Sequence, residues 1–222
     1  MVDVGCGDRR FEPLFTPYVD SYTGVEHEAV FASTDASKRK NAPDVLYDGR
    51  HLPFEDASFD TVVSTEVLEH TPDPAGLVAE MARVLKPDGI MILTAPFAFR
   101  LHEEPHDYFR YTPHGLSSLL ERVGLRIIET RPFGSVFSVV GHKLNSYLAF
   151  QVAHLQGLGR MLGKMGHEPS THGDGLRVWT LPLVLPAMAG IAGAARVLDR
   201  VTRDPTEALG YLVVAERSRQ PL

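Results

Sequence analysis

Residues 1–7 read Met-Val-Asp-Val-Gly-Cys-Gly, a short apolar run that stops at two glycines. The run predicts a strand, and glycines directly after a strand let the backbone approach a ligand and leave amide donors free. The third glycine of the dinucleotide-binding fingerprint is absent, because Arg10 stands in its place. Asp3 adds a carboxylate on the strand itself, which repels a pyrophosphate and suits a cationic ligand.

Strand-like and helix-like segments alternate outward from this run. Because parallel strands are joined by crossover helices, the alternation predicts an α/β fold with a Rossmann-like, doubly wound and mostly parallel sheet. Further strands are expected at Ser21–Val25, Asp44–Tyr47, Asp60–Ser64, Ile90–Leu93, Leu125–Thr130 and Tyr211–Glu216, and helices at Arg10–Val19, Pro74–Leu85, Thr112 to about Val123 and Val136–Leu158.

Composition limits the class of protein. A chain of 222 residues fits one α/β domain. Its formal net charge of −6 and the lack of a basic block argue against nucleic acid as a partner. Cys6 is the single cysteine, which fits a reducing compartment, and the first residues lack the pattern of a secretory signal. We therefore expect a cytoplasmic protein.

Two more acidic positions follow the second and third predicted strands. Glu26 comes directly after Thr23-Gly24-Val25, where a carboxylate can accept the hydroxyls of a ribose. Asp48-Gly49 follows the third strand, where a carboxylate can accept from an amino group on a base edge. Since the carboxyl ends of strands in a doubly wound sheet line one crevice, these acids and Asp3 predict a shared binding site.

A set of motifs resembles a known family. Asp3–Gly7, Glu26, the run Asp48–Asp60, Val67-Leu68-Glu69-His70 and Leu85–Gly89 look like those of class I S-adenosylmethionine-dependent methyltransferases. The chain is most similar to the broad bacterial group, type 11-like, that methylates small molecules. The resemblance covers about Met1 to Phe133 and implies a seven-stranded sheet whose last strand is antiparallel.

The resemblance also implies roles for individual residues, with S-adenosyl-L-methionine as the cofactor. Asp3, Gly5 and Gly7 would hold the methionine end, Glu26 the ribose diol, Asp48 with Gly49 the adenine, and Ser64 would line the pocket near the sulfonium.

Family members usually carry a helix before the glycine-rich strand, whereas this chain starts almost inside it. The expected organisation is one domain in three parts. These are a cofactor-binding core (1–133), a helical insertion or lid (134–207) that we expect to supply cover, and a closing strand with a tail (208–222).

Acceptor chemistry is expected on two segments that follow strands. Methyl transfer from a sulfonium needs alignment and often a base that removes the acceptor's proton. His70 follows the fourth strand and His106 lies on the loop after the fifth, so both are candidate catalytic bases. On the same loop, Asp107, Arg110 and Tyr111 are candidate substrate-binding residues.

Two patterns carry weaker signals. His102-Glu103-Glu104-Pro105-His106 matches the zinc-protease motif, but Pro105 is incompatible with the helix that the motif needs, and we expect no metal site. Val178–Ala195 holds no charged residue, yet two prolines and two glycines favour a buried or lid helix over a membrane segment. A membrane-surface contact is considered but not favoured, and a homodimer is a candidate state.

We therefore expect a methyltransferase that acts on a small-molecule acceptor. The polar loop His102–Tyr111 suits O-methylation of a sugar, glycolipid precursor or secondary metabolite. Two alternatives remain open from the sequence: a cofactor-binding, non-catalytic subunit and a nicotinamide-dependent oxidoreductase.

Overall fold

The computed structural model describes residues 1–33, 41–149, 175–202 and 206–219. The chain divides into two compact units. One comprises Met1–Phe97, Leu101–Phe133 and Gly210–Leu222, and the other comprises Ala98–Arg100 and Gly134–Leu209.

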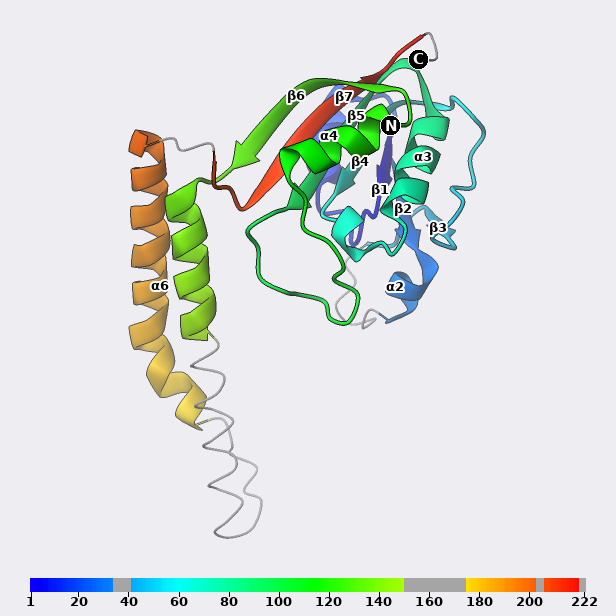
Figure 1. Ribbon diagram of the computed structural model, residues 1–222. Coiled ribbons are helices and arrows are strands. Elements are labelled where there is room, and N and C mark those ends of the chain that lie inside the picture. Colours follow the sequence, from blue (N-terminus) through cyan, green and yellow to red (C-terminus); the bar gives the residue numbers. More distant parts are fainter. Residues whose placement is uncertain (34–40, 150–174, 203–205, 220–222) are drawn as a thin grey trace. The chain divides into compact units, whose positions relative to one another are not determined.

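A seven-stranded sheet forms the first unit, in the order β3-β2-β1-β4-β5-β7-β6 (Figure 1). The pairs from β3 to β5 are parallel, whereas β7 is antiparallel to both β5 and β6. The expected sheet with an antiparallel last strand is thus confirmed. The strands are β1 (Val2–Val4), β2 (Thr23–His27), β3 (Val45–Tyr47), β4 (Phe59–Thr65), β5 (Leu85–Pro96), β6 (Leu125–Phe133) and β7 (Gly210–Arg217).

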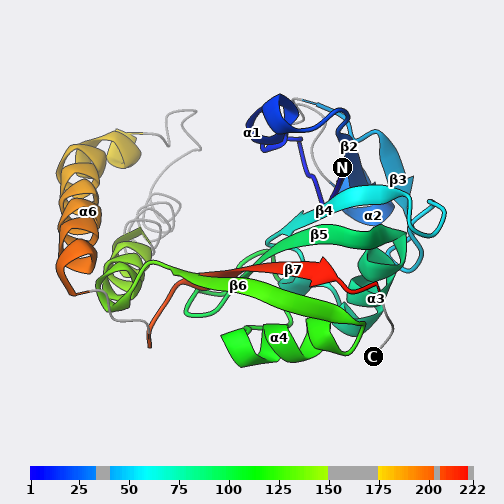
Figure 2. The same cartoon turned by 90° about the horizontal axis from the view of Figure 1, so that it is seen from above.

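Helices α3 (Pro74–Val84) and α4 (Pro113–Glu121) cover one face of this sheet (Figures 1 and 2). Each begins at a side-chain cap: Asp73 accepts from the Gly76 amide at 3.0 Å, and Thr112 accepts from the Gly115 amide at 3.0 Å. These bonds satisfy amides that have no partner within the helix. The buried side chains of α3 recur at helical spacing and pack on the sheet: Leu77, Val78, Met81, Ala82 and Val84.

Three local features differ from the sequence prediction. β5 begins at Leu85 rather than Ile90, because Leu85 pairs with Phe59 across a register irregularity that takes up the Lys-Pro-Asp-Gly segment. The expected helix Arg10–Val19 is two short pieces, α1 (Glu12–Phe15) and η1 (Thr16–Tyr18), with Pro17 at the start of the second. A short helix that the sequence did not indicate, α2 (Glu28–Ser33), follows β2.

The second unit is helical where the structure describes it. Residues 136–149 form one helix, and α6 (Gly175–Thr202) forms the other; the rest of the predicted helix to Leu158 lies outside the described residues. Asp199 of α6 accepts hydrogen bonds from the amides of Ser135 and Ser138, at 3.1 and 3.2 Å, and from both hydroxyls. Among the described helices, α6 included, none combines the length and the apolar character needed to cross a bilayer.

Candidate active site

Asp3 lies in the middle of β1, an inner strand between β2 and β4, and is completely buried. The Tyr22 hydroxyl donates to its Oδ2 at 2.6 Å, while Oδ1 has no hydrogen-bond partner among the described residues. Burial raises the pKa of this carboxyl to about 6. A buried carboxylate oxygen without a donor is costly, so Asp3 provides an acceptor that a cationic or donor group of a ligand can satisfy.

The loop after β1 depends on two glycines with positive φ, +78° at Gly5 and +56° at Gly7. The amides of Gly5 and Cys6 donate to the Val25 carbonyl of β2, at 2.8 and 3.1 Å. A Cβ at Gly5 would overlap the Val67 side chain, whereas a Cβ at Gly7 would meet nothing within 4 Å. Glycine therefore serves a different purpose at each position. Gly5 packs closely against protein, and Gly7 faces open space that a ligand can approach.

Glu26, expected just after the second strand, is the penultimate residue of β2; it lies beside this loop and is almost fully buried. Its carboxylate accepts from the Gly7 amide at 2.8 Å and from the His27 amide at 2.7 Å. Burial raises the pKa of Glu26, although these two bonds act in the opposite direction. Strand pairing places Asp3 opposite Gly24, and alternation puts Glu26 on the same face as both.

Asp48 and Gly49 follow β3 on an exposed turn. Asp48 accepts from the amides of Arg50 and His51, at 2.8 and 3.0 Å, and these bonds lower the pKa of its carboxyl. Gly49 has a φ of +81°, and a Cβ there would overlap the His27 ring. This turn therefore packs closely against the ring of His27, a residue that the sequence analysis did not single out.

Ser64 lies on β4, is buried, and its hydroxyl has no hydrogen-bond partner among the described residues. Asp3 is in register with Val63, so alternation places Ser64 on the opposite face from Asp3.

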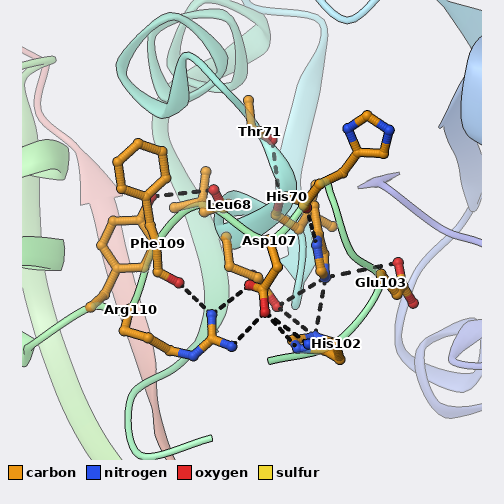
Figure 3. A network of polar contacts seen from close by, with 12 residues as sticks. Leu68, His70, Thr71, His102, Glu103, Asp107, Phe109 and Arg110 are labelled. Carbon is orange, nitrogen blue, oxygen red and sulfur yellow. Dashed lines mark hydrogen bonds and ion pairs between the residues drawn. The ribbon is translucent and has the colours of Figure 1, made fainter. Parts of the chain in front are cut away.

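A second polar group forms where the loop after β5 packs on η3 (Leu68–His70), the turn after β4 (Figure 3). The amides of Tyr108 and Phe109 donate to the Glu69 carbonyl, at 2.7 and 3.3 Å. The Nδ1 of His70 lies 2.7 Å from the His106 carbonyl. These backbone bonds fix the loop against η3, although the two segments lie far apart in the sequence.

The docked loop brings His102 to His70. Their Nε2 atoms lie 3.2 Å apart, and the rings meet edge to face. The Nδ1 of His102 lies 3.3 Å from Asp107, which also accepts from the His102 amide at 2.9 Å. Arg110 holds this carboxylate with two bonds, at 2.6 and 2.7 Å, and keeps the pKa of Asp107 well below its usual range.

Glu69 lies beneath the two imidazoles with no exposed surface. Its Oε1 is 3.7 Å from His70 Nε2 and 3.9 Å from His102 Nε2, and neither carboxylate oxygen accepts a hydrogen bond from the described residues. Burial raises the pKa of Glu69 to about 8. One ligand atom from each of Glu69, His70 and His102 lies within 4.8 Å of the other two, so the three can share one bound ion.

The predicted acceptor-side residues have different surroundings. His70 belongs to this group, whereas the exposed His106 contributes its carbonyl, and its ring contacts the Tyr108 hydroxyl at 3.0 Å. Asp107 and Arg110 pair with each other. Tyr111 is buried and donates to the Leu68 carbonyl at 3.2 Å.

Glu69 and His102 are the residues that sequence reasoning missed. No helix includes residues 102–106, all of which the structure describes, so the zinc-protease geometry is absent as expected. His102 nevertheless meets a histidine and a glutamate from a different segment. The available signal was that both segments follow the carboxyl ends of neighbouring strands, where the sheet collects functional groups.

Part of the chain is similar to known methyltransferases. Residues 2–93 match a family described as a methyltransferase domain. An uncharacterized methyltransferase of Mycobacterium sp. (strain KMS) is 36% identical over 94 residues, which are 42% of this chain and 37% of that protein. An uncharacterized methyltransferase of Mycobacterium tuberculosis (strain ATCC 25177 / H37Ra) is 36% identical over 96 residues, 42% of this chain and 38% of that protein. The match thus spans little more than a third of these relatives.

Solved structures share the fold over most of the chain. A SAM dependent methyltransferase from Archaeoglobus fulgidus superposes with a TM-score of 0.54 at 16% identity, covering 97% of this chain and 85% of that one. The [4+2]-cyclase SpnF gives a TM-score of 0.54 at 22% identity, covering 98% and 73%. At these identities the similarity establishes the fold.

Proposed function

We propose that this chain is a class I S-adenosylmethionine-dependent methyltransferase that methylates a hydroxyl of a small polar acceptor, because residues 2–93 match a methyltransferase domain. The acceptor class is a sugar, a glycolipid precursor or a secondary metabolite. When bound, S-adenosylmethionine supplies an electrophilic methyl group on a sulfonium. The polar loop 102–111, docked beside η3, supports a hydroxylated acceptor over an apolar one.

The observation that carries the proposal is the unpartnered Oδ1 of Asp3, which is buried on the inner strand β1. We assign it to the ammonium group at the methionine end of the cofactor. Gly7 supports this, because a Cβ there would meet open space at the end of the same strand. Gly5 holds the loop in shape by packing on Val67.

The remaining cofactor contacts follow the strand ends. Glu26 keeps acceptor capacity beyond the two amides that it binds, so it can also take the ribose hydroxyls. The Asp48–Gly49 turn takes the adenine. Ser64, one residue before the end of β4, stays a prediction from the family resemblance, because its side chain lies on the opposite face of the sheet from Asp3.

On the acceptor side we propose His70 as the group that takes the proton. Its Nδ1 donates to the His106 carbonyl, which leaves the Nε2 lone pair as the basic position. Glu69 Oε1 lies 3.7 Å from His70 Nε2, so the carboxylate form of Glu69 would stabilise the imidazolium that forms. His106 is the second candidate for the base, because its exposed ring contacts Tyr108. Asp107 and Arg110 pair with each other and hold the loop in place.

Calorimetry with S-adenosylmethionine, together with a turnover assay for S-adenosylhomocysteine over a panel of hydroxylated acceptors, tests the proposal. Asp3→Asn is expected to weaken cofactor binding about 10- to 100-fold, the scale of losing a hydrogen bond to a charged group. Asp60→Asn is the matched control, because Asp60 is exposed and pairs with Lys86. The [4+2]-cyclase SpnF has a similar fold but is named for a different reaction, so the fold alone does not identify the reaction. Cofactor binding without methyl transfer to any acceptor would therefore reject the proposed reaction.

A further inference from the structure

We propose that Glu69, His70 and His102 form a binding site for one divalent transition-metal cation of the zinc class. The three residues come from η3 and from the loop after β5, and their ligand atoms lie within 4.8 Å of one another. The metal site does not depend on the proposed methyl transfer.

The first argument is the contact between the two imidazoles. His70 Nδ1 faces a carbonyl and therefore donates, and His102 Nδ1 lies 3.3 Å from the Asp107 carboxylate. In the tautomer in which His102 Nδ1 donates to Asp107, both neutral rings carry a lone pair at Nε2. In that tautomer the two lone pairs face each other at 3.2 Å and repel, and a cation between them would turn the repulsion into two favourable contacts. Two nitrogens on a tetrahedral zinc ion are separated by about 3.4 Å, since each bond is about 2.0–2.1 Å.

The second argument is Glu69. Its carboxylate is fully buried and accepts no hydrogen bond from the described residues, and one oxygen lies 3.7 and 3.9 Å from the two Nε2 atoms. A buried carboxylate with neither donor nor cation is strongly unfavourable. A bound cation would supply the missing partner for Glu69 and would lie against the Nε2 atoms of both imidazoles.

The third argument is the surrounding shell. Histidine ligands of metals usually donate their second nitrogen to a carbonyl or a carboxylate, which fixes the ring and raises its basicity. The His106 carbonyl has this role for His70, and Asp107, held by two bonds from Arg110, has it for His102. The exposed Glu103 lies 3.9 Å from His70 Nε2 and adds negative charge on the outer side.

Two histidines and one carboxylate leave at least one coordination position open, as in catalytic zinc sites. If the proposed methylation holds, the acceptor hydroxyl would take that position, the ion would lower its pKa, and the proton would pass to bulk water before the methyl group is transferred. A bound ion would occupy the Nε2 of His70, so the role of His70 as the base applies to the metal-free protein.

Metal binding is tested on tag-free, chelator-treated protein by calorimetry with Zn²⁺ alone and by elemental analysis after dialysis. We expect one Zn²⁺ per chain, and no binding of Mg²⁺, which prefers oxygen ligands. Glu69→Gln and His102→Ala should each weaken Zn²⁺ binding by at least about tenfold, because even the loss of a residue that only supports a ligand costs about this much. His114→Ala, which removes an exposed histidine on α4, should bind as the wild type does.

The outcomes separate the metal site from the enzyme activity. Zn²⁺ binding that is absent, or equal in all variants with unchanged circular dichroism, overturns the site, whatever the methyltransferase assay shows. Stoichiometric, variant-sensitive binding establishes it even if no acceptor is methylated. Glu69→Gln keeps the side-chain size, so it reports on the ligand charge if His102→Ala fails to fold.

Discussion

His70 and His102 are 32 positions apart in the sequence, yet their Nε2 atoms face each other at 3.2 Å. The contact exists because the loop after β5 donates two amides to the Glu69 carbonyl on the turn after β4. The acceptor-side group is therefore assembled by backbone hydrogen bonds between two strand ends, and its side chains are set before any ligand arrives. Substitutions within it should act on chemistry more than on cofactor binding.

The first prediction separates the two histidines proposed as bases. His70→Ala should lower turnover about 10²- to 10⁴-fold, the usual contribution of a general base. His106→Ala should change turnover only a few-fold, because His106 contributes its backbone carbonyl, which alanine retains. Single-turnover rates at saturating cofactor measure both. Equal losses in the two variants would contradict the assignment, and a large loss in His106→Ala alone would reverse it.

The second prediction concerns pH and Asp3. Burial raises its pKa from 3.8 to about 6 in the folded protein, so the folded state binds this proton more tightly than the unfolded state. Asp3 therefore contributes most to the free energy of unfolding below about pH 4. This contribution decreases as the pH rises from about 4 to 6. Above about pH 6 the buried charge lowers the free energy of unfolding by a constant amount. Two pKa units correspond to about 3 kcal/mol at pH 7.5.

Asp3→Asn should consequently stabilise the ligand-free protein at pH 7.5 by up to this amount, and much less at pH 4.5. Asparagine can still accept from the Tyr22 hydroxyl, so the local geometry is kept. Urea unfolding of both proteins at the two pH values gives the difference. A variant that is less stable than the wild type at pH 7.5 would show that Asp3 already has its charge partner.

The third prediction concerns the helix that begins after Ser135. Asp199 accepts from the amides of Ser135 and Ser138, which have no partner within that helix. Asp199→Ala should destabilise residues 136–149 by about 1–2 kcal/mol, the cost of losing an N-terminal cap. Hydrogen exchange measures this locally. Exchange in β1 and β4, which the substitution should leave unchanged, serves as the internal control. Unchanged protection of residues 136–149 would mean that the cap contributes nothing.

The order of strands and helices was predictable because hydrophobic runs and cap residues act locally. Thr112-Pro113 predicts the start of α4, and the pattern from Leu77 to Met81 predicts the buried face of α3. β5 was predicted five residues too late, because its first residues pair with β4 through a register irregularity that local preference does not encode. Pairing between strands, rather than propensity, sets that boundary.

The site was predictable to the level of the strand ends and no further. Asp3 and Glu26 were predicted to share a site because acids on consecutive strands meet at one edge of a parallel sheet, and the strand register places them on one face. His102 was dismissed with the motif that contained it, because the motif was tested only as a helix. Its partner Glu69 and its docking through Tyr108 and Phe109 depend on long-range backbone bonds that have no sequence signature.

The last prediction distinguishes the two glycines after β1. Gly5→Ala should destabilise the fold, because the new Cβ overlaps Val67 and the φ of +78° is unfavourable for alanine. Adding Val67→Ala should recover the packing part of that loss, leaving about 1–2 kcal/mol of backbone strain. Gly7→Ala should cost only the strain, because its Cβ meets nothing, yet it should weaken S-adenosylmethionine binding. Thermal unfolding and calorimetry on the four proteins measure both quantities. Normal cofactor affinity in Gly7→Ala would show that the ligand does not approach this loop.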